Sequence, residues 1–284
     1  MINLKMADVY MENMTRLPSE IHRLNQQFDL LTKNIGYILH PSVTFPPAPR
    51  IADMGTGTAR FLLQVQPTVS DANAVFEGYD IASDLFPPPE KLPPGISLSL
   101  LDFKQSFPQH MHGQYDLVHV RMLVSGMLPS DWEPAVRNIF RILRPGGYIQ
   151  WEECEFLNGE WLKSTPTARV ETTEFMGKAF SAALHEQFQH GWNTLPGQMR
   201  AAGFTSVISD IVSSDRVLET RADMTASILS LVFTWARMMT ERGVSGPLFG
   251  DHLDDLQKVV NEEIQSGGYF KFNIHVACAQ KPRM

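Results

Sequence analysis

A short apolar segment that runs into a glycine turn is the feature that most constrains how this chain folds. We expect residues 50–54 to form a strand, 55–58 to end it, and a helix to follow over 59–65. Glycines at such a junction let a ligand approach the backbone closely, next to N–H groups at the start of the helix. The turn therefore predicts a ligand-binding site, although a Gly-x-Gly turn taken by itself is weak evidence.

The rest of the chain alternates between strand-like and helix-like segments. We expect further strands at 74–80, 96–101, 115–120, 148–153, 204–212 and 270–279. We expect further helices at 8–40, 131–143 with Asp131 as the N-cap, 158–202 with a break at 190–191, 220–242 and 251–266. Such alternation predicts an α/β fold with a mostly parallel, Rossmann-like sheet.

This pattern also suggests how the chain is organised. Residues 1–48 are expected to be an N-terminal helical segment that covers the ligand, and 49–284 to be the main domain. Helical insertions at about 158–202 and 215–266 are expected to form a lid over the ends of the strands.

The composition excludes several classes of protein. The net charge is −7 and no cluster of Lys and Arg is present, whereas nucleic-acid binding usually needs a basic surface. Cys154 and Cys278 match neither a disulfide framework nor a zinc spacing, so we expect two buried thiols and no metal site. The first residues lack the long apolar stretch that is typical of a signal peptide, and the most apolar run, 227–239, is short and contains Arg237. We therefore expect a cytoplasmic or nuclear protein that binds neither nucleic acid nor membrane.

Two cofactor classes compete for the glycine turn. Dinucleotide binding favours a third glycine at the sixth position of the motif, but Arg60 stands there and would disturb the packing of helix on strand. The alternative pattern has an acidic residue followed by small residues at two-residue steps, namely Asp53, Gly55, Gly57 and Ala59. This pattern is similar to the first motif of class I S-adenosylmethionine (SAM) dependent methyltransferases, with Ala59 in place of a frequent third glycine.

Acidic residues at the next strands support the SAM pattern. Asp80 ends the second strand, where a carboxylate can accept hydrogen bonds from both ribose hydroxyls. Asp102 follows the third strand and is placed to take the adenine amino group, with Phe103 packed on the ring. Asp116 opens the fourth strand. Each residue alone has an ordinary structural explanation, but their order places them where open α/β sheets bind ligands.

With these residues in place, the chain resembles fungal secondary-metabolism methyltransferases of the group related to the velvet-complex regulator methyltransferase. The resemblance covers about residues 20–155, and its more specific segments are Leu-Val-His-Val-Arg at 117–121 and Gln-Trp-Glu-Glu at 150–153. The generic Pro-Gly-Gly turn at 145–147 also fits. The resemblance implies a seven-stranded sheet whose last strand, about 270–279, runs antiparallel.

The resemblance also implies which residues surround SAM. The backbone of 119–121 is expected to face the methionine part, and Tyr10 of the N-terminal helix to cover the cofactor. The expected cofactor-binding residues are Tyr10, Asp53, Gly55, Thr56, Gly57, Asp80, Ile81, Leu101, Asp102, Phe103, His119, Val120 and Arg121.

The sulfonium of SAM is already activated, so such a protein mainly aligns an acceptor with the methyl carbon, and a general base is optional. The candidates for that base are His119 at the end of the fourth strand, His190 in the expected lid and Glu153 after the fifth strand. Each also has a structural interpretation, either as a buried, hydrogen-bonded side chain or as an exposed helix residue.

Three functions are compatible with the sequence. Methionines and aromatic residues in the expected lid favour a small, largely apolar acceptor, so the leading hypothesis is SAM-dependent transfer of a methyl group to an O or N atom of a secondary metabolite. The second is a SAM-binding enzyme that rearranges or cyclises its substrate without methyl transfer. The third is a non-catalytic regulator of secondary metabolism. The sequence leaves the acceptor and the oligomeric state open.

Overall fold

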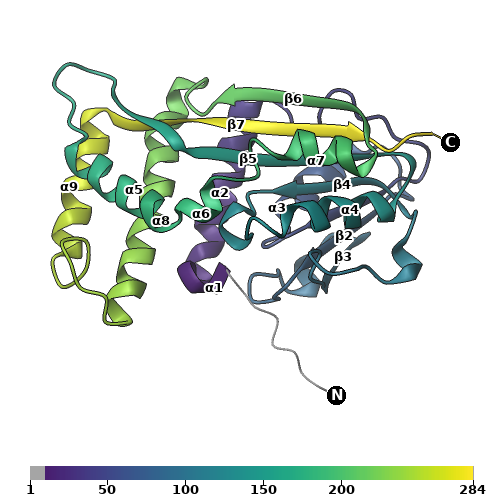
Figure 1. The fold of residues 1–284 in the computed structure, drawn as a ribbon, viewed down its shortest axis with the longest axis horizontal. Helices are drawn as coiled ribbons and strands as arrows, with labels where there is room; N and C mark the ends of the chain where they lie inside the picture. The colour runs from purple at the N-terminus through teal and green to yellow at the C-terminus, as the bar shows by residue number, and fades with distance from the viewer. Residues whose placement is uncertain (1–9, 284) are drawn as a thin grey trace.

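The computed structural model of the protein describes residues 10–283, which form a seven-stranded sheet with helices on both faces (Figure 1). The strands lie in the order β3-β2-β1-β4-β5-β7-β6. Neighbouring strands from β3 to β5 are parallel, while β7 is antiparallel to both β5 and β6. The strands are β1 Arg50–Met54, β2 Val75–Asp80, β3 Ile96–Leu100, β4 Tyr115–Arg121, β5 Leu143–Lys163, β6 Thr205–Ser213 and β7 Gly268–Gln280. The predicted Rossmann-like sheet with an antiparallel last strand is confirmed.

The carboxyl ends of the parallel strands meet at one edge of the sheet. Met54 at the end of β1 pairs with Tyr79 of β2 and with Val120 of β4. Asp80 at the end of β2 pairs with Leu100 at the end of β3. The residues that follow these four strands therefore lie close together, at the edge where open α/β sheets bind ligands.

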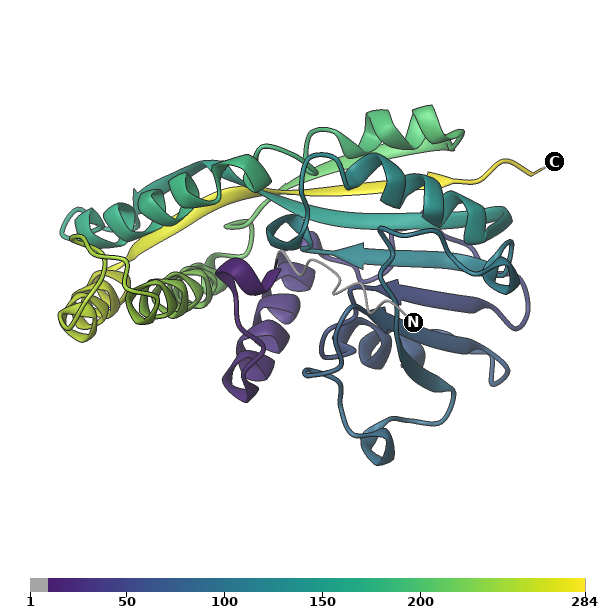
Figure 2. The same cartoon turned by 60° about the horizontal axis from the view of Figure 1, so that its bottom comes forward.

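Helices cover the two faces of this sheet. In Figure 2, α4 and α7 lie on one face, and the helices of the N-terminal part of the chain lie on the other. The helices are α1 Tyr10–Asn13, α2 Pro18–Ile35, α3 Arg60–Val65, α4 Trp132–Ile142, α5 Glu171–Ala183, α6 His185–Phe188, α7 Leu195–Ala202, α8 Arg221–Glu241 and α9 Leu253–Ser266.

The N-terminal segment forms two helices, where the sequence predicted one over 8–40. Leu17 is extended (φ −68°, ψ 154°) because it precedes Pro18, and a residue before proline disfavours helical backbone. Pro18 then begins α2, a position in which its missing N–H costs nothing. Gly36 ends the helix in a left-handed conformation with φ 92°. Residues 8 and 9 of the predicted helix lie outside the described residues.

Strands β5 and β7 extend well beyond the rest of the sheet as a two-stranded ribbon. Their pairing continues outward as far as Lys163 and Gly268, with a register shift between Glu155 and Glu160. We call the part of the pair beyond Glu155 the arm. Figures 1 and 2 show α5, α8 and α9 gathered around the arm, away from the main body of the sheet. These three helices pack on one another and are called the lid below.

The arm corrects the prediction that a helical region begins near residue 158. Trp161 of β5 stacks on Phe270 of β7, with ring centroids 4.3 Å apart. Residues 158–163 are therefore strand, because pairing with a segment distant in the sequence outweighs their local pattern. The predicted break at 190–191 is confirmed, since it separates α6 from α7.

Smaller predictions have mixed outcomes. Asp131 precedes α4 but does not cap it; its carboxylate accepts a hydrogen bond from the Leu128 N–H at 2.9 Å and lies 3.7 Å from the Lys104 amine. Cys154 and Cys278 are buried thiols, as predicted. Among residues 10–283, no helix is both long enough and apolar enough to cross a membrane.

Glu263 of α9 fastens two lid helices together, and its replacement tests this role. Its buried carboxylate accepts hydrogen bonds from the Thr172 and Thr173 N–H groups, at 3.0 and 2.8 Å, and from the Thr173 hydroxyl at 2.9 Å. Glu263→Gln turns one acceptor into a donor, so we expect it to lower the free energy of unfolding by about 1–3 kcal/mol. Urea unfolding measures the change, with Glu262→Gln, at an exposed neighbour, as the control. Equal midpoints for the two variants would contradict this role.

Candidate functional site

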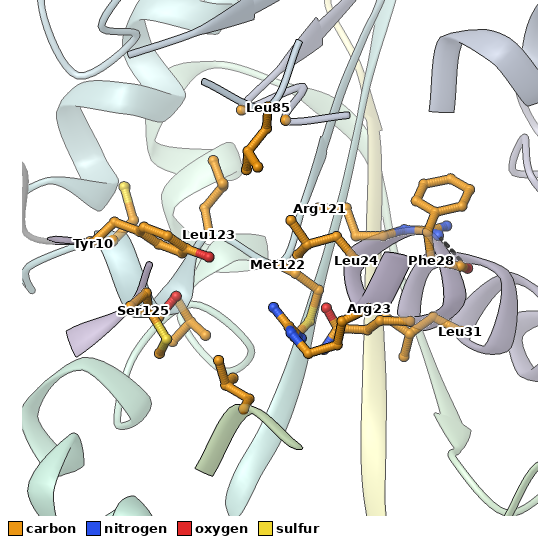
Figure 3. Close-up of a pocket in the computed structure, with 18 of the residues that line it drawn as sticks. Tyr10, Arg23, Leu24, Phe28, Leu31, Leu85, Arg121, Met122, Leu123 and Ser125 are labelled. Carbon is orange, nitrogen blue, oxygen red and sulfur yellow. Dashed lines mark hydrogen bonds between the residues drawn. The ribbon is translucent and has the colours of Figure 1, made fainter. Parts of the chain in front are cut away.

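A cavity runs from the carboxyl ends of the strands to the lid (Figure 3). It is bounded by α2, the glycine turn and the segment after β4, and it continues to aromatic residues of the arm and the lid. Most of the residues predicted to bind SAM line it, namely Tyr10, Asp53, Gly55, Thr56, Gly57, Asp80, Ile81, Leu101, Asp102, Phe103, His119 and Arg121. Val120 does not, because its side chain is buried in the main hydrophobic core.

The glycine turn is held against the end of β2. The Gly55 and Thr56 N–H groups both donate to the Tyr79 carbonyl, at 2.8 and 3.0 Å. The Gly57 N–H donates to the Asp80 carboxylate at 2.9 Å. These three N–H groups are therefore paired within the protein and fix the shape of the turn.

The turn needs residues that tolerate a left-handed backbone. Gly55 has φ 71°, and a Cβ there would come within 2.5 Å of Leu123. Gly57 has φ 49°, and a Cβ would meet nothing within 4 Å, so this residue borders open space. Ala59 is also left-handed, with φ 59°, which costs a non-glycine residue about 1 kcal/mol and explains why glycine suits this position. The turn thus presents an uncovered backbone surface at Gly57.

The Asp80 carboxylate lies between the turn and the cavity. Besides Gly57, it accepts a longer hydrogen bond from the Ala82 N–H at 3.4 Å. Burial raises the pKa of Asp80, and the backbone donors and Arg16 oppose that rise. An ionised carboxylate has about four acceptor sites, so Asp80 keeps capacity for the hydroxyls of a ligand.

The residues after β3 form the next part of the cavity wall. The Asp102 carboxylate accepts a hydrogen bond from the Lys104 N–H at 3.0 Å through its Oδ1 atom. Phe103 is largely buried, and its ring meets the ring of Trp151 edge-on at 6.0 Å. Phe103 therefore packs mainly into the core, and only part of it is available to a ligand.

Asp53, His119 and Glu152 form a buried row beneath the cavity. Asp53 lies 2.7 Å from His119 Nδ1 and accepts a hydrogen bond from the Thr56 hydroxyl at 2.7 Å. His119 Nε2 is 3.9 Å from the Glu152 carboxylate, and the ring stacks on Phe61 with centroids 3.6 Å apart. His119 is only 1% exposed and is paired with Asp53, so we infer that it orients the Asp53 carboxylate.

Arg121 extends this row to α2. Its Nε donates to Glu152, and its Nη1 donates to the Phe28 carbonyl at 3.2 Å and to the Thr32 hydroxyl at 2.8 Å. The guanidinium also lies 3.9 Å from the centroid of the Phe28 ring. Arg121 therefore ties α2 to the sheet.

The other two candidate bases do not line the cavity. His190 follows α6 and is half-buried outside the cavity wall. Glu153 is fully buried and accepts hydrogen bonds from the Leu123 N–H and the Trp151 indole, both at 2.9 Å, and from the Val124 N–H at 3.4 Å. Glu153 therefore holds the backbone of the segment after β4, and neither side chain is placed to reach an acceptor in the cavity.

Sequence reasoning missed the polar residues of α2. Glu20, Arg23 and Gln27 are buried. Arg23 and Gln27 line the cavity. The signal was present, because these polar residues recur at the three- and four-residue steps that define one face of a helix. The cavity residues 122–127 were also missed, because their position depends on contacts with other strands.

Comparisons with curated proteins connect this site with known activities. No known protein-family profile matches the chain. A methyltransferase from Penicillium sp is 36% identical over 165 residues, which are 55% of this chain and 56% of that protein. An N-methyltransferase from Claviceps purpurea is 27% identical over 266 residues, which are 89% of this chain and 92% of that protein. The secondary metabolism regulator laeA from Coprinopsis cinerea is 33% identical over 107 residues, which are 38% of this chain and 25% of that protein.

This chain is similar to fungal methyltransferases and to a regulator of secondary metabolism. It matches just over half the length of the Penicillium protein and most of the Claviceps protein. Among solved structures, phosphoethanolamine N-methyltransferase 2 from Haemonchus contortus, in complex with S-adenosylhomocysteine, has a TM-score of 0.54 at 14% identity and covers 97% of this chain and 60% of that chain. The predicted methyltransferase fold is thereby confirmed, and the relatives support the predicted SAM-dependent activity.

Asp80 is the residue whose replacement most directly tests the cofactor site. Asp80→Asn removes the charge from an acceptor at the cavity wall, so we expect SAM binding to weaken by about 1–3 kcal/mol. Titration calorimetry with SAM measures the change. Asp84→Asn is the matched control, because Asp84 is exposed and is not part of the cavity wall. Unchanged affinity in Asp80→Asn would remove Asp80 from the site.

Glu153 predicts how stability depends on pH. Burial raises the pKa of Glu153 from its usual 4.5 to about 7, so between these values the folded protein holds a proton that the unfolded chain has lost. Stability therefore falls as the pH rises through this range, by about 3 kcal/mol. Glu153→Gln is neutral throughout, so its free energy of unfolding should rise relative to the natural protein as the pH increases.

Urea unfolding between about pH 5 and pH 8 gives both pH profiles. Glu160→Gln is the control, because Glu160 is an exposed glutamate of the same strand. Parallel profiles for the natural protein and Glu153→Gln would show that Glu153 does not titrate in this range.

Proposed function

We propose that this protein transfers the methyl group of SAM to an oxygen or nitrogen atom of a small, largely apolar molecule. The observation that carries the proposal is the continuity of the cavity, which Asp80 borders at the sheet edge and aromatic rings border at the arm and the lid. Methyl transfer needs such a shared space, because donor and acceptor must be held in line within a short distance.

The residues at the sheet edge fit SAM. Asp80 has acceptor capacity for ribose hydroxyls, and Asp102 is placed near Ile81 and Leu101 on the wall that would receive adenine. The open backbone at Gly57 lets a ligand approach closely. When bound there, SAM supplies a methyl group activated by the sulfonium charge.

The far end of the cavity fits an apolar acceptor. Phe156 and Phe180 each contact Phe188, with ring centroids 5.3 and 5.9 Å apart. Other apolar side chains there are Trp161, Ile228, Leu231, Val232 and Phe270. Ser125 and Ser181 add hydroxyl groups that can orient a polar atom of the acceptor.

In this proposal the protein acts mainly by positioning its two ligands and by closing the cavity around them. His119 is paired with Asp53 and buried, so it acts by fixing the end of β1 against β4. Tyr10 lies against Gly126, where a Cβ would be 3.6 Å from Tyr10 Cβ, and its ring points into the cavity in Figure 3. Tyr10 thereby helps to close the cavity and exclude water. We retain the expectation of a cytoplasmic protein that acts on a small molecule.

Transfer of label from methyl-labelled SAM tests the proposal. Incubation of the protein with labelled SAM and extracts that contain candidate metabolites should give a labelled product heavier than its precursor by one CH₂. Asp80→Ala should lose most of this activity because its cofactor site is weakened, and Asp84→Asn should retain it. A product without added mass would instead favour a rearrangement or cyclisation. Absence of any product across the extracts would contradict enzymatic activity and leave the regulator hypothesis.

A further inference from the structure

Arg23 is a buried cation on the wall of the cavity. It lies on α2 with its side chain 7% exposed, and its Nε donates to the Glu20 carboxylate one helical turn earlier, at 2.7 Å. Glu20 is itself buried, with a side chain 5% exposed. This pairing fixes one edge of the guanidinium along the helix and leaves the other edge to face elsewhere.

The remaining edge of the guanidinium has an unsatisfied nitrogen. Among residues 10–283, Nη1 of Arg23 is buried and has no hydrogen-bond partner. A buried donor on a charged group that lacks a partner costs more than an unpaired neutral donor. In Figure 3, Arg23 extends from α2 into the cavity beside Met122. Arg23 lines the cavity, so an acceptor group that binds against its guanidinium would supply the partner that Nη1 lacks.

Arg121, another arginine of the wall, has a different environment. It also has a buried nitrogen without a partner, Nη2, but its Nη1 is hydrogen-bonded to α2 and its guanidinium lies over the Phe28 ring. In Figure 3, the head of Arg121 lies beside Phe28, away from the centre of the cavity. Arg23 is thus the better placed of the two to meet a ligand.

The charges around Arg23 indicate the chemistry of that ligand. Burial raises the pKa of Tyr10, Arg23 lowers it, and Asp80 and Glu20 raise it, so these groups share one region of the cavity. Asp80 is engaged with the glycine turn through Gly57 and Ala82. Within residues 10–283, Nη1 of Arg23 has no carboxylate or other acceptor within hydrogen-bond distance, and guanidinium groups bind carboxylates with particularly good geometry.

We propose that Arg23, oriented by Glu20, is a carboxylate-binding site inside the cavity. The proposal rests on the proposed function, because it assumes that a ligand occupies this cavity during methyl transfer. Two ligands could supply the carboxylate: the amino-acid part of SAM, or an acid group of the acceptor. The position near Tyr10 and Asp80 favours the amino-acid part of SAM, and the experiment distinguishes the two.

The first experiment compares S-adenosylhomocysteine with methylthioadenosine, which has the same nucleoside but no carboxylate. If Arg23 holds the carboxylate of SAM, Arg23→Met should bind S-adenosylhomocysteine about 10- to 100-fold more weakly than the natural protein. Its affinity for methylthioadenosine should be unchanged. Arg23→Lys should recover part of the loss, because it keeps the charge but not the planar fork.

The second experiment uses phenylacetate and its neutral analogue phenylacetamide, each titrated into protein saturated with S-adenosylhomocysteine. If Arg23 holds an acid group of the acceptor, the natural protein should prefer phenylacetate, and Arg23→Met should lose that preference. Arg237→Met is the matched control, because Arg237 is a half-exposed arginine of α8 that pairs with Asp254. The thermal midpoint of every variant checks that it is folded, and Arg23→Lys carries the test if Arg23→Met does not fold.

The outcomes distinguish failure of the carboxylate site from failure of the proposed function. If the natural protein binds both nucleosides but the variants at Arg23 change neither preference, the carboxylate site is overturned and the proposed function stands. If the natural protein binds neither nucleoside, the proposed function fails first. Loss of affinity for S-adenosylhomocysteine in the first experiment supports a site for SAM. Loss of the preference for phenylacetate in the second supports a site for the acceptor.

Discussion

The site depends on a buried row of polar and charged side chains that joins three strands to helix α2. Asp53 of β1, His119 of β4 and Glu152 of β5 follow one another in this row, and Arg121 extends it to α2. Burying such groups is costly unless they are paired, and the pairing of Asp53 with His119 and of Arg121 with Glu152 holds these side chains in a fixed arrangement. It thereby sets the position of the glycine turn through Asp53 and of α2 through Arg121.

Helix α2 is part of the site because of this connection. Its buried face carries Arg23 and Gln27 into the cavity, while Arg121 holds its backbone at Phe28. On the opposite side, Glu153 fastens the segment after β4, in which Met122 has a left-handed backbone with φ 56°. A non-glycine residue keeps such a conformation only where its surroundings enforce it, and these contacts do so beside the cavity.

The far half of the cavity exists because β5 and β7 continue beyond the sheet. The arm gives α5 a surface to pack on so closely that a Cβ at Gly177 would come within 2.1 Å of the Trp161 ring. Glu263 then joins α9 to the start of α5. Aromatic side chains from separate segments therefore meet at the end of the cavity opposite Asp80, and together with the sheet edge they enclose one continuous space.

The local sequence pattern by itself determined the sheet and the part of the site that lies at the sheet edge. The strand ends at Met54 and Asp80 were predicted at the positions found, because a glycine turn and the alternation of apolar residues are local signals. The carboxylates predicted beside SAM line the cavity for the same reason, since a residue that directly follows a parallel strand must lie at that edge.

Only the tertiary structure decided which charged groups are partners and which face a ligand. His119 and Glu153 looked like candidate bases, but their partners, Asp53 and Leu123, belong to segments distant in the sequence. The strand at 158–163 and the burial of Arg23 Nη1 without a partner also depend on long-range packing. A local pattern shows that a residue is polar or apolar, whereas its function depends on the distant groups that surround it after folding.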